Sequence, residues 1–268
     1  VPLPVGPGIG LINGLNSLQS ILGGVHQLSA FTQAFPLGNQ RMADFFGFNE
    51  GFESNFVDPI STYMETNPQV TITELLGLIK SLPAVPSATA ELAADGSAVT
   101  FSVAYRLEAS KDVPIDFGVG GDNYGIRVNA EDTLHIDAEA KFEFSFGVDL
   151  TGSVDPGEAF FVIPGDLTFR ASLSAPEVNL SINIGFLGAD IDGGNIEMDA
   201  SFAVNFADPT PDGKLTLNDL INTPFSSLVN VTVPSATFFA ELPVTVTLGD
   251  TFLTDGTQSI VIEDDNIF

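Results

Sequence analysis

The feature of this sequence that most restricts its fold is the strict alternation of apolar and polar side chains over residues 134–150. Alternate positions of a β-strand point to opposite faces of a sheet, so this segment has one apolar face and one wet face. Such strands are typical of antiparallel sheets, because parallel sheets are buried on both faces. At about 3.4 Å per residue, the strand could span roughly 58 Å. Its apolar positions are Leu134, Ile136, Ala138, Ala140, Phe142, Phe144, Phe146, Val148 and Leu150.

Further segments with a period of two follow Pro86, and together they predict a sheet of many strands. Asp95 and Gly96 form a hairpin signal that would pair a strand at 88–94 with the next strand. Another strand is expected over residues 257–262, close to the C-terminus. The other alternating segments are 99–107, 167–173, 178–186, 196–206 and 238–248.

Before Pro86 the apolar residues recur at helical spacing instead. The first helical stripe consists of Leu11, Leu15, Leu18, Leu22 and Val25. A weaker stripe consists of Phe56, Ile60 and Met64. In a third segment Thr71 stands three residues before Glu74, which is the spacing of a capping box, and an apolar run follows. Pro83 and Pro86 end that helix.

A sheet with one apolar face must cover that face, and the helical opening of the chain is the available cover. We therefore expect an α+β fold dominated by β-structure: a long-stranded, curved antiparallel sheet with its apolar face covered by the N-terminal helices. Burial between the two layers would be the main stabilising contribution, at roughly 25 cal/mol per Å². The expected parts are an extended N-terminal linker strand at 1–10, a helical subdomain at 11–86, the antiparallel sheet at 87–250 and a C-terminal linker strand at 251–268.

The charge of the chain is strongly unbalanced, because 8 Lys and Arg stand against 35 Asp and Glu, a formal net charge of −27. Clustered Lys and Arg are needed to neutralise phosphates, so we exclude nucleic acid as a partner and disfavour anionic membrane surfaces. No apolar run approaches the roughly 20 residues of a spanning helix, and no membrane insertion is expected. An acidic chain without cysteine suits a secreted bacterial protein. The start at Val1 suggests a processed product or a piece of a longer polypeptide, located outside the cell or at its surface.

Residues 208–219 match the register of the twelve-residue EF-hand calcium loop. Calcium takes six to eight hard oxygen ligands, which alternate residues of a tight loop can supply together. Gly213 falls at position 6, where the loop turns sharply. We therefore predict calcium as a cofactor. The predicted ligands, at loop positions 1, 3, 5, 7 and 12, are Asp208, Thr210, Asp212, Lys214 (through its backbone carbonyl) and Asp219.

This loop resembles EF-hand and dockerin loops but departs from them in three respects. Thr210 replaces the usual Asp or Asn, Asp219 replaces the bidentate Glu, and a strand rather than a helix precedes the loop. Leu215, at position 8, matches the apolar residue that such loops direct into the core. The alternative interpretation is a Pro- and Asp-rich turn before a short helix at 217–220, with no ion.

Three other acidic regions are weaker candidates for an ion. Residues 190–195 are acidic and Gly-rich, and a hairpin turn between two strands needs such residues without any metal. Asp112 with Asp116, and the turn at 120–123, are comparable. Residues 263–266 could help to bind an ion shared with a neighbouring domain.

Signals for catalysis are weak. His26 lies near the end of the first helix and His135 lies on the wet face of a strand, and we interpret both as incidental. The sequence has no nucleophile elbow, no cysteine nucleophile and no metalloprotease pair of histidines. Paired carboxylates of a glycoside hydrolase remain open, because the sheet offers many acidic pairs and none is singled out. We therefore do not expect an enzyme.

Five segments give the chain its character: a helical opening, long alternating strands and an acidic loop. They are Thr73–Leu82, Leu134–Leu150, Ala159–Val162, Asn183–Ala200 and Ala207–Leu220. Their order, over residues 10–250, resembles the repeat unit of very large secreted bacterial proteins of the adhesin-like kind, which carry LEPR-XLL and hemolysin-type calcium-binding neighbours. The resemblance implies an extracellular, calcium-dependent structural or adhesive module.

The expected function is therefore mechanical. The protein would be a calcium-stabilised subunit of a fibre, or one repeat of a giant surface protein. Its partners would be neighbouring copies of the same or a similar domain, in tandem or as a polymer, and a terminal strand that completes a neighbour's sheet could link them. The alternative is a carrier that holds a lipid or another hydrophobic ligand on the apolar face of the curved sheet.

Overall fold

The computed structural model describes most of the chain. The described residues are 1–33, 41–45, 47–115, 126–130, 132–151, 156–184, 187–249, 251–253 and 258–267. The helices are α1 (Val5–Gly24), η1 (Val25–Gln27), α2 (Ser29–Thr32), α3 (Met42–Phe45), α4 (Phe48–Phe52), η2 (Glu53–Val57), α5 (Asp58–Thr66), α6 (Ile72–Ser81), α7 (Pro156–Ala159), α8 (Leu217–Asn222) and α9 (Phe225–Leu228). The strands are β1 (Ser87–Leu92), β2 (Ala98–Pro114), β3 (Ile126–Ala130), β4 (Thr133–Asp149), β5 (Phe160–Ile184), β6 (Leu187–Phe206), β7 (Leu215–Thr216), β8 (Val229–Leu248), β9 (Thr251–Phe252) and β10 (Gln258–Asp264).

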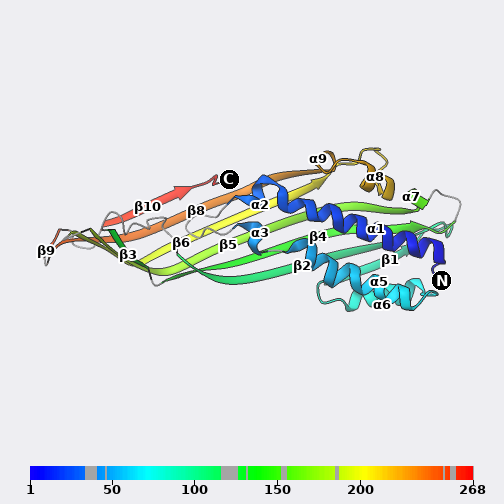
Figure 1. Cartoon of the computed structure of the whole chain (residues 1–268), viewed down its shortest axis with the longest axis horizontal. Coiled ribbons are helices and arrows are strands. Elements are labelled where there is room, and N and C mark those ends of the chain that lie inside the picture. Colours follow the sequence, from blue (N-terminus) through cyan, green and yellow to red (C-terminus); the bar gives the residue numbers. More distant parts are fainter. Residues whose placement is uncertain are drawn as a thin grey trace.

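In the described part of the chain, the strands form one 10-stranded sheet with the order β1-β2-β4-β5-β6-β8-β10. Strands β3 and β7 pair with β5, and β9 pairs with β8. Every pair of named strands is antiparallel. The long strands run along the elongated axis of the molecule, and the sheet they form is twisted and curved (Figure 1). The fold is α+β and dominated by β-structure, as the alternation predicted.

Strand β4 shows why the alternating pattern was informative. Its apolar residues lie on one face, where Phe142 and Phe146 are completely buried, while His135 and Asp137 are exposed on the other. In the pairing with β2, Phe142 lies opposite Tyr105, which is also completely buried. A shift of one residue in the strand pairing would point all these rings toward solvent. Burial of this face therefore specifies the register.

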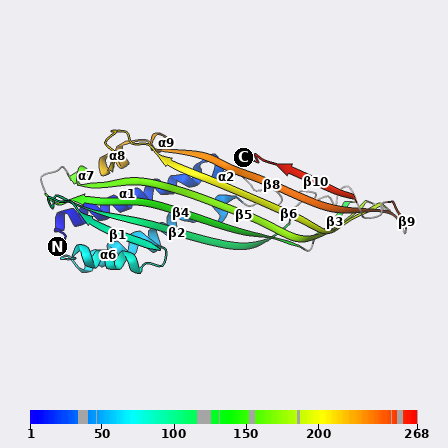
Figure 2. The ribbon, with the colours of Figure 1, turned by 180° about the vertical axis from the view of Figure 1, so that it is seen from behind.

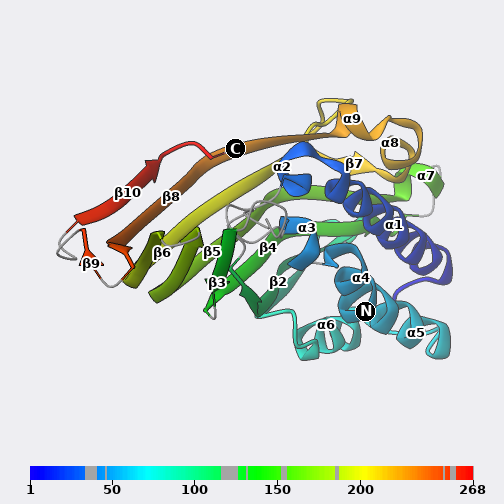
Figure 3. The same ribbon diagram turned by 60° about the vertical axis from the view of Figure 1, so that its left-hand side comes forward.

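The helices cover the apolar face of the sheet. The view from behind in Figure 2 shows the strands in front of α1 and α2, and the view in Figure 3 shows the helices as a separate layer. Phe52 of α4 and Phe56 of η2 pack edge-on against Tyr105 of β2, with ring centroids 5.2 and 6.0 Å apart, respectively. Phe56 also meets Phe144 of β4 at 5.7 Å. Such pairs add to the hydrophobic stabilisation of the layer contact.

Helix α1 lies close to the sheet because glycine faces the strands. A Cβ atom added to Gly14 would lie 2.1 Å from ring carbons of Phe160, the first residue of β5. Leu11, Leu15 and Leu22 of the same helix are fully buried. The predicted apolar stripe is thus the face of α1 that contacts the core.

Helix α6 begins where the capping-box pattern predicted. The Thr71 hydroxyl accepts the Glu74 N–H at 3.2 Å, and Oε2 of Glu74 accepts the Thr71 N–H at 2.8 Å. These bonds satisfy two of the N–H groups that a helix start leaves without partners. They also lower the pKa of the Glu74 carboxyl, because hydrogen bonds to the carboxylate favour its charged form.

The extended N-terminal segment expected over residues 1–10 is shorter in the structure, because α1 begins at Val5. Pro7 lies in the first helical turn, where its missing N–H has no intrahelical partner, so this proline is compatible with a helix. The preceding residues are tied down by a bond from the Leu3 N–H to the Val70 carbonyl at 2.8 Å.

The C-terminal segment expected as a linker strand, 251–268, differs from that expectation. Strand β10 forms, but it pairs with β8 of its own chain. Beyond it, the Ile267 N–H donates to the Ala236 carbonyl at 3.3 Å, and its carbonyl accepts Nε2 of Gln33 at 3.0 Å. The described end of the chain therefore folds back onto its own sheet and helices.

The prediction of a hairpin turn at 190–195 is wrong. Strand β6 continues through this segment, and its register with β8 shifts between Ile191 and Asn195, which marks a β-bulge. Gly193 has a φ of 73°. A bulge and a hairpin turn both favour glycine at a position with positive φ, so composition did not distinguish them.

The two strands expected at 167–173 and 178–186 form one long strand, β5. The register with β6 shifts between Ala175 and Val178, next to Glu177, which has a φ of 64°. This irregularity interrupts the alternation without ending the strand.

Candidate functional site

The loop 208–219 leaves the sheet at the end of β6 and returns to it at β7. Gly213 has a φ of 83°, the left-handed conformation that a sharp turn at loop position 6 needs. Two residues later Leu215 is buried and pairs with Val162 of β5. The loop is therefore anchored by an apolar residue at position 8, as its register predicted.

Asp208 closes the loop through backbone N–H groups. Its Oδ1 accepts the Thr210 N–H at 2.9 Å, and its Oδ2 accepts the Gly213 N–H at 2.8 Å. Asp212 makes a similar local bond, from its Oδ1 to the Lys214 N–H at 2.9 Å. These bonds hold the carboxylates of positions 1 and 5 against the loop backbone.

The end of the loop is a second capping box, and it includes a residue that the sequence reasoning missed. The Thr216 hydroxyl, at position 9, accepts the Asp219 N–H at 3.2 Å, and Oδ2 of Asp219 accepts the Thr216 N–H at 2.8 Å. The Thr-x-x-Asp spacing at 216–219 was the available signal. Asp219 thus uses its Oδ2 to start helix α8.

The Lys214 side chain does not compete for the carboxylates of the loop. Its Nζ lies 4.3 Å from the centroid of the Phe161 ring, a cation–π contact that draws the charge toward β5. The predicted ligand at this position is the backbone carbonyl, which remains compatible with that contact.

The donors of the loop suit calcium better than a transition metal, because they are carboxylate, hydroxyl and carbonyl oxygens. Within the described residues, however, no group of three or more Asp, Glu, His or Cys side chains is gathered to hold a metal ion. Asp208 and Asp212 turn toward backbone N–H groups instead. Calcium binding would require the carboxylates of Asp208, Asp212 and Asp219 to converge.

The other acidic candidates have local roles in the structure. Asp190 accepts the Ser181 hydroxyl at 2.6 Å within the β5–β6 pair. Asp264 accepts the Asn266 N–H at 2.9 Å in the turn after β10. Asp112 contacts His135, whereas Asp116 and residues 120–123 lie outside the described residues.

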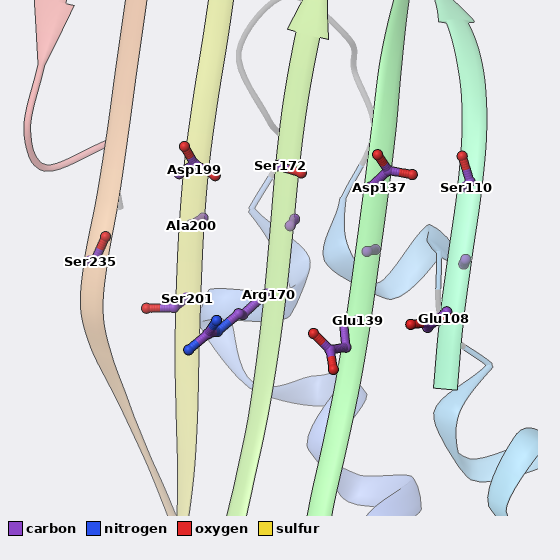
Figure 4. A pocket seen from close by; sticks show the side chains of 13 residues that line it. Glu108, Ser110, Asp137, Glu139, Arg170, Ser172, Asp199, Ala200, Ser201 and Ser235 are labelled. Atoms are coloured by element: carbon purple, nitrogen blue, oxygen red, sulfur yellow. The ribbon is translucent and has the colours of Figure 1, made fainter. Parts of the chain in front are cut away.

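A cavity of about 750 Å³ lies on the outer face of the sheet, opposite the helices. Figure 4 shows its polar side chains in rows across the strands. One row consists of Glu108, Glu139, Arg170, Ser201 and Ser235, and the other of Ser110, Asp137, Ser172 and Asp199. Between the rows, on the helix-covered face, lies a row of alanines formed by Ala109, Ala138, Ala171, Ala200 and Ala236.

The outer groove is acidic apart from one central guanidinium. Arg170 extends toward Ser201 and away from Glu139 (Figure 4). Glu139 instead pairs with Nε of Arg106 at 2.7 Å. The groove thus presents hydroxyls and carboxylates to water, which is the chemistry of a hydrated surface.

A histidine cluster at one end of the groove was missed by sequence reasoning, because its members meet across two strands. Nδ1 of His135 lies 2.7 Å from Oδ1 of Asp112, and its Nε2 lies 3.4 Å from Asp137 and 3.3 Å from the Ser110 hydroxyl. The hydrogen bond to Asp112 and the charge of Asp137 raise the pKa of His135.

The Ser110–His135–Asp112 order resembles a nucleophile, base and orienting group. Two carboxylates lie beside the ring and favour its charged form, which is the arrangement of an ion pair. The His135 side chain is also half exposed. We therefore describe the cluster as a surface ion pair.

Comparison with protein families, with curated proteins and with solved structures finds no match to this chain. Among the described helices, none is both long enough and apolar enough to cross a bilayer. The resemblance to adhesin-like repeats therefore stays a prediction from the sequence segments.

Proposed function

We propose that the protein is an extracellular structural or adhesive module, stabilised by calcium at the loop 208–219. It would act as a subunit of a fibre or as one repeat of a giant surface protein of the adhesin-like kind. The observation that carries the proposal is the loop register, in which left-handed Gly213 at position 6, buried Leu215 at position 8 and the Thr216–Asp219 cap at positions 9 and 12 all agree.

Calcium would act on the connection between two parts of the sheet. The loop joins the end of β6 to β7, and β7 pairs with the start of β5 beside Phe161. A cation that gathers Asp208, Asp212 and Asp219 would fix this corner and neutralise part of the negative charge. The ion would therefore stiffen the end of the molecule where helices α7, α8 and α9 also lie (Figure 1).

The rest of the molecule suits a load-bearing role. Its sheet is long, its core is filled by aromatic rings, and its outer face is hydrated and acidic. Such a surface keeps a strongly charged protein soluble while the edge formed by β10 remains available to neighbouring copies. The partners proposed are copies of the same or a similar domain.

Thermal melting in calcium, compared with melting in chelator, tests the proposal. A native state that binds calcium gains about 2.7 kcal/mol at a free concentration a hundred times the dissociation constant. The double variant Asp208→Asn with Asp212→Asn should lose this gain, and Asp190→Asn, at the bulge of β6, should keep it. An equal melting temperature in calcium and chelator would refute calcium binding.

A carrier of hydrophobic ligands is the alternative function. It requires an apolar cavity between the sheet and the helices, but Phe52, Phe56 and Phe144 pack against one another there. The cavity described above lies instead on the opposite face, where hydroxyl, carboxylate and guanidinium groups line it together with alanines. The packing favours the structural module, and native mass spectrometry that detects co-purifying lipid would support the carrier.

A further inference from the structure

Strand β10 is an unusual edge of the sheet. It pairs with β8 on one side and ends the strand order on the other. All of its residues are exposed, including Ile260 (50%), Val261 (54%) and Ile262 (46%). It lies apart from the helix layer at one margin of the sheet (Figure 3).

Edge strands of natural proteins normally carry a device against pairing, such as a central charge, a proline, a bulge or a covering helix. Strand β1 at the opposite edge lies beside helix α6. The centre of β10, Ser259 to Ile262, contains neither charge nor proline, and its register with β8 is continuous. Within the described part of the chain no further strand pairs with this edge, so it offers a ladder of unpaired backbone groups.

We propose that β10 binds β10 of a second copy of this chain, antiparallel and centred on Val261, so that two sheets join into one. The inference deepens the building-block role proposed above and rests on it, because it names the partner and the surface. In this register the opposed pairs are Val261 with Val261, Ile260 with Ile262, Ser259 with Glu263, and Gln258 with Asp264.

The sequence of β10 is complementary to itself in this register. The branched apolar side chains oppose one another, which is the favourable kind of cross-strand pair. Each acid opposes a donor: the Ser259 hydroxyl can donate to Glu263, and the Gln258 amide can donate to Asp264. No two acids of β10 lie directly opposite each other.

The same register also matches the two faces of the sheet. In the pairing with β8, Ile260 lies opposite Leu242 and Ile262 lies opposite Ala240, so both isoleucines lie on the apolar face. A twofold axis perpendicular to the sheet keeps this face on the same side in both copies. The apolar row of β8 would therefore continue across the junction.

Shifted registers lack this complementarity. Centring the pair on Ile262 would place Ile260 opposite Asp264 and Val261 opposite Glu263, so apolar groups would oppose carboxylates. A shift of a single residue in the pairing would place apolar-face residues opposite outer-face residues. The chemistry of the strand thus selects one register.

The negative charge of the chain opposes dimerisation and makes it depend on the salt concentration. Each chain carries a formal charge of −27, so two copies repel each other at low ionic strength. The screening length falls to about 8 Å at physiological salt, which weakens this repulsion. Association should therefore strengthen as sodium chloride is raised.

Analytical ultracentrifugation of the full chain over a range of concentrations tests the pairing. The wild type should form dimers, and Val261→Lys or Val261→Glu alone should sediment as monomers, because like charges would oppose each other at the axis. A mixture of the two variants should recover dimers. Ile221→Lys, an exposed substitution on α8, should leave dimerisation unchanged.

Cysteine substitutions check the register, because the chain contains no native cysteine. Under oxidation, Val261→Cys should crosslink with itself, and Ser259→Cys should crosslink with Glu263→Cys but much more slowly with itself. A wild type that stays monomeric at every concentration and salt level would overturn the proposal. Dimers in which Val261→Cys does not crosslink would overturn it as well, because another surface would then hold the copies.

Each measurement is repeated in calcium and in chelator, which separates this proposal from the previous one. A monomer that calcium stabilises would refute the β10 pairing but not the calcium loop. A crosslinked dimer whose melting temperature is the same in calcium and in chelator would support the pairing and refute calcium binding by the loop.

Discussion

Replacing Gly14 with alanine tests whether α1 packs against the sheet through this glycine. Gly14 lies in the middle of α1, and a Cβ atom there would lie 2.1 Å from Cδ1 and Cγ of Phe160 and 2.4 Å from Cδ2. These separations are far below van der Waals contact. The Phe160 ring is completely buried, so it has no solvent-filled space into which it can turn.

The magnitude follows from two opposing contributions. Alanine in place of a helical glycine stabilises a helix by up to about 1 kcal/mol. Overpacking in a close-packed core costs about 1–3 kcal/mol. Gly10 of the same helix provides the matched control, because a Cβ atom there would meet no heavy atom within 4 Å. Both variants gain the same helix propensity of alanine over glycine, but only Gly14→Ala pays the overpacking cost. Gly14→Ala should therefore be less stable than Gly10→Ala by about 1–3 kcal/mol.

Urea unfolding, followed by far-ultraviolet circular dichroism, measures this difference in the free energy of unfolding. Gly10→Ala should unfold at or above the midpoint of the wild type, and Gly14→Ala should unfold below it. If both variants were equally stable, Gly14 would not face Phe160, and the placement of α1 on the sheet would be wrong.

Three further outcomes are expected. Gly213→Ala should cost about 1–2 kcal/mol because of its left-handed backbone, whereas Gly77→Ala in α6, where space is open and φ is ordinary, should stabilise the protein in the same urea assay. Thr71→Ala should remove the cap of α6 and cost about 1 kcal/mol in thermal unfolding; an unchanged stability would contradict the capping box. In an NMR titration the pKa of His135 should lie above its usual 6.5 and fall in Asp112→Asn; its stabilising contribution is complete below pH 6.5 and is lost as pH rises through the folded-state pKa.

Much of the fold could be predicted because it depends on local pattern. Alternation in 134–150 specifies which side chains β4 buries, and this holds whichever strands lie beside it. The cap at Thr71 and Glu74 is equally local, since its partners are three residues apart. The ends of elements were harder to predict, as the bulge at Gly193 shows. A glycine with positive φ specifies a backbone conformation but does not say whether the strand reverses.

The candidate sites also differ in whether they depend on a local pattern or on the pairing of distant strands. The loop register at 208–219 is a pattern within one segment, so the turn at Gly213 and the anchor at Leu215 were predictable. The cluster of His135 with Asp112 depends on the pairing of β2 with β4. No single segment contains that information, because the register between distant strands follows from the packing of the whole buried face.

A crystal structure grown in calcium, with an anomalous difference map over the loop, tests the central claim most directly. We expect one ion, with oxygens of Asp208, Asp212 and Asp219 gathered around it at about 2.3–2.6 Å. A map without an ion peak, in which Asp208 still accepts the N–H groups of Thr210 and Gly213, would contradict the calcium-stabilised building block.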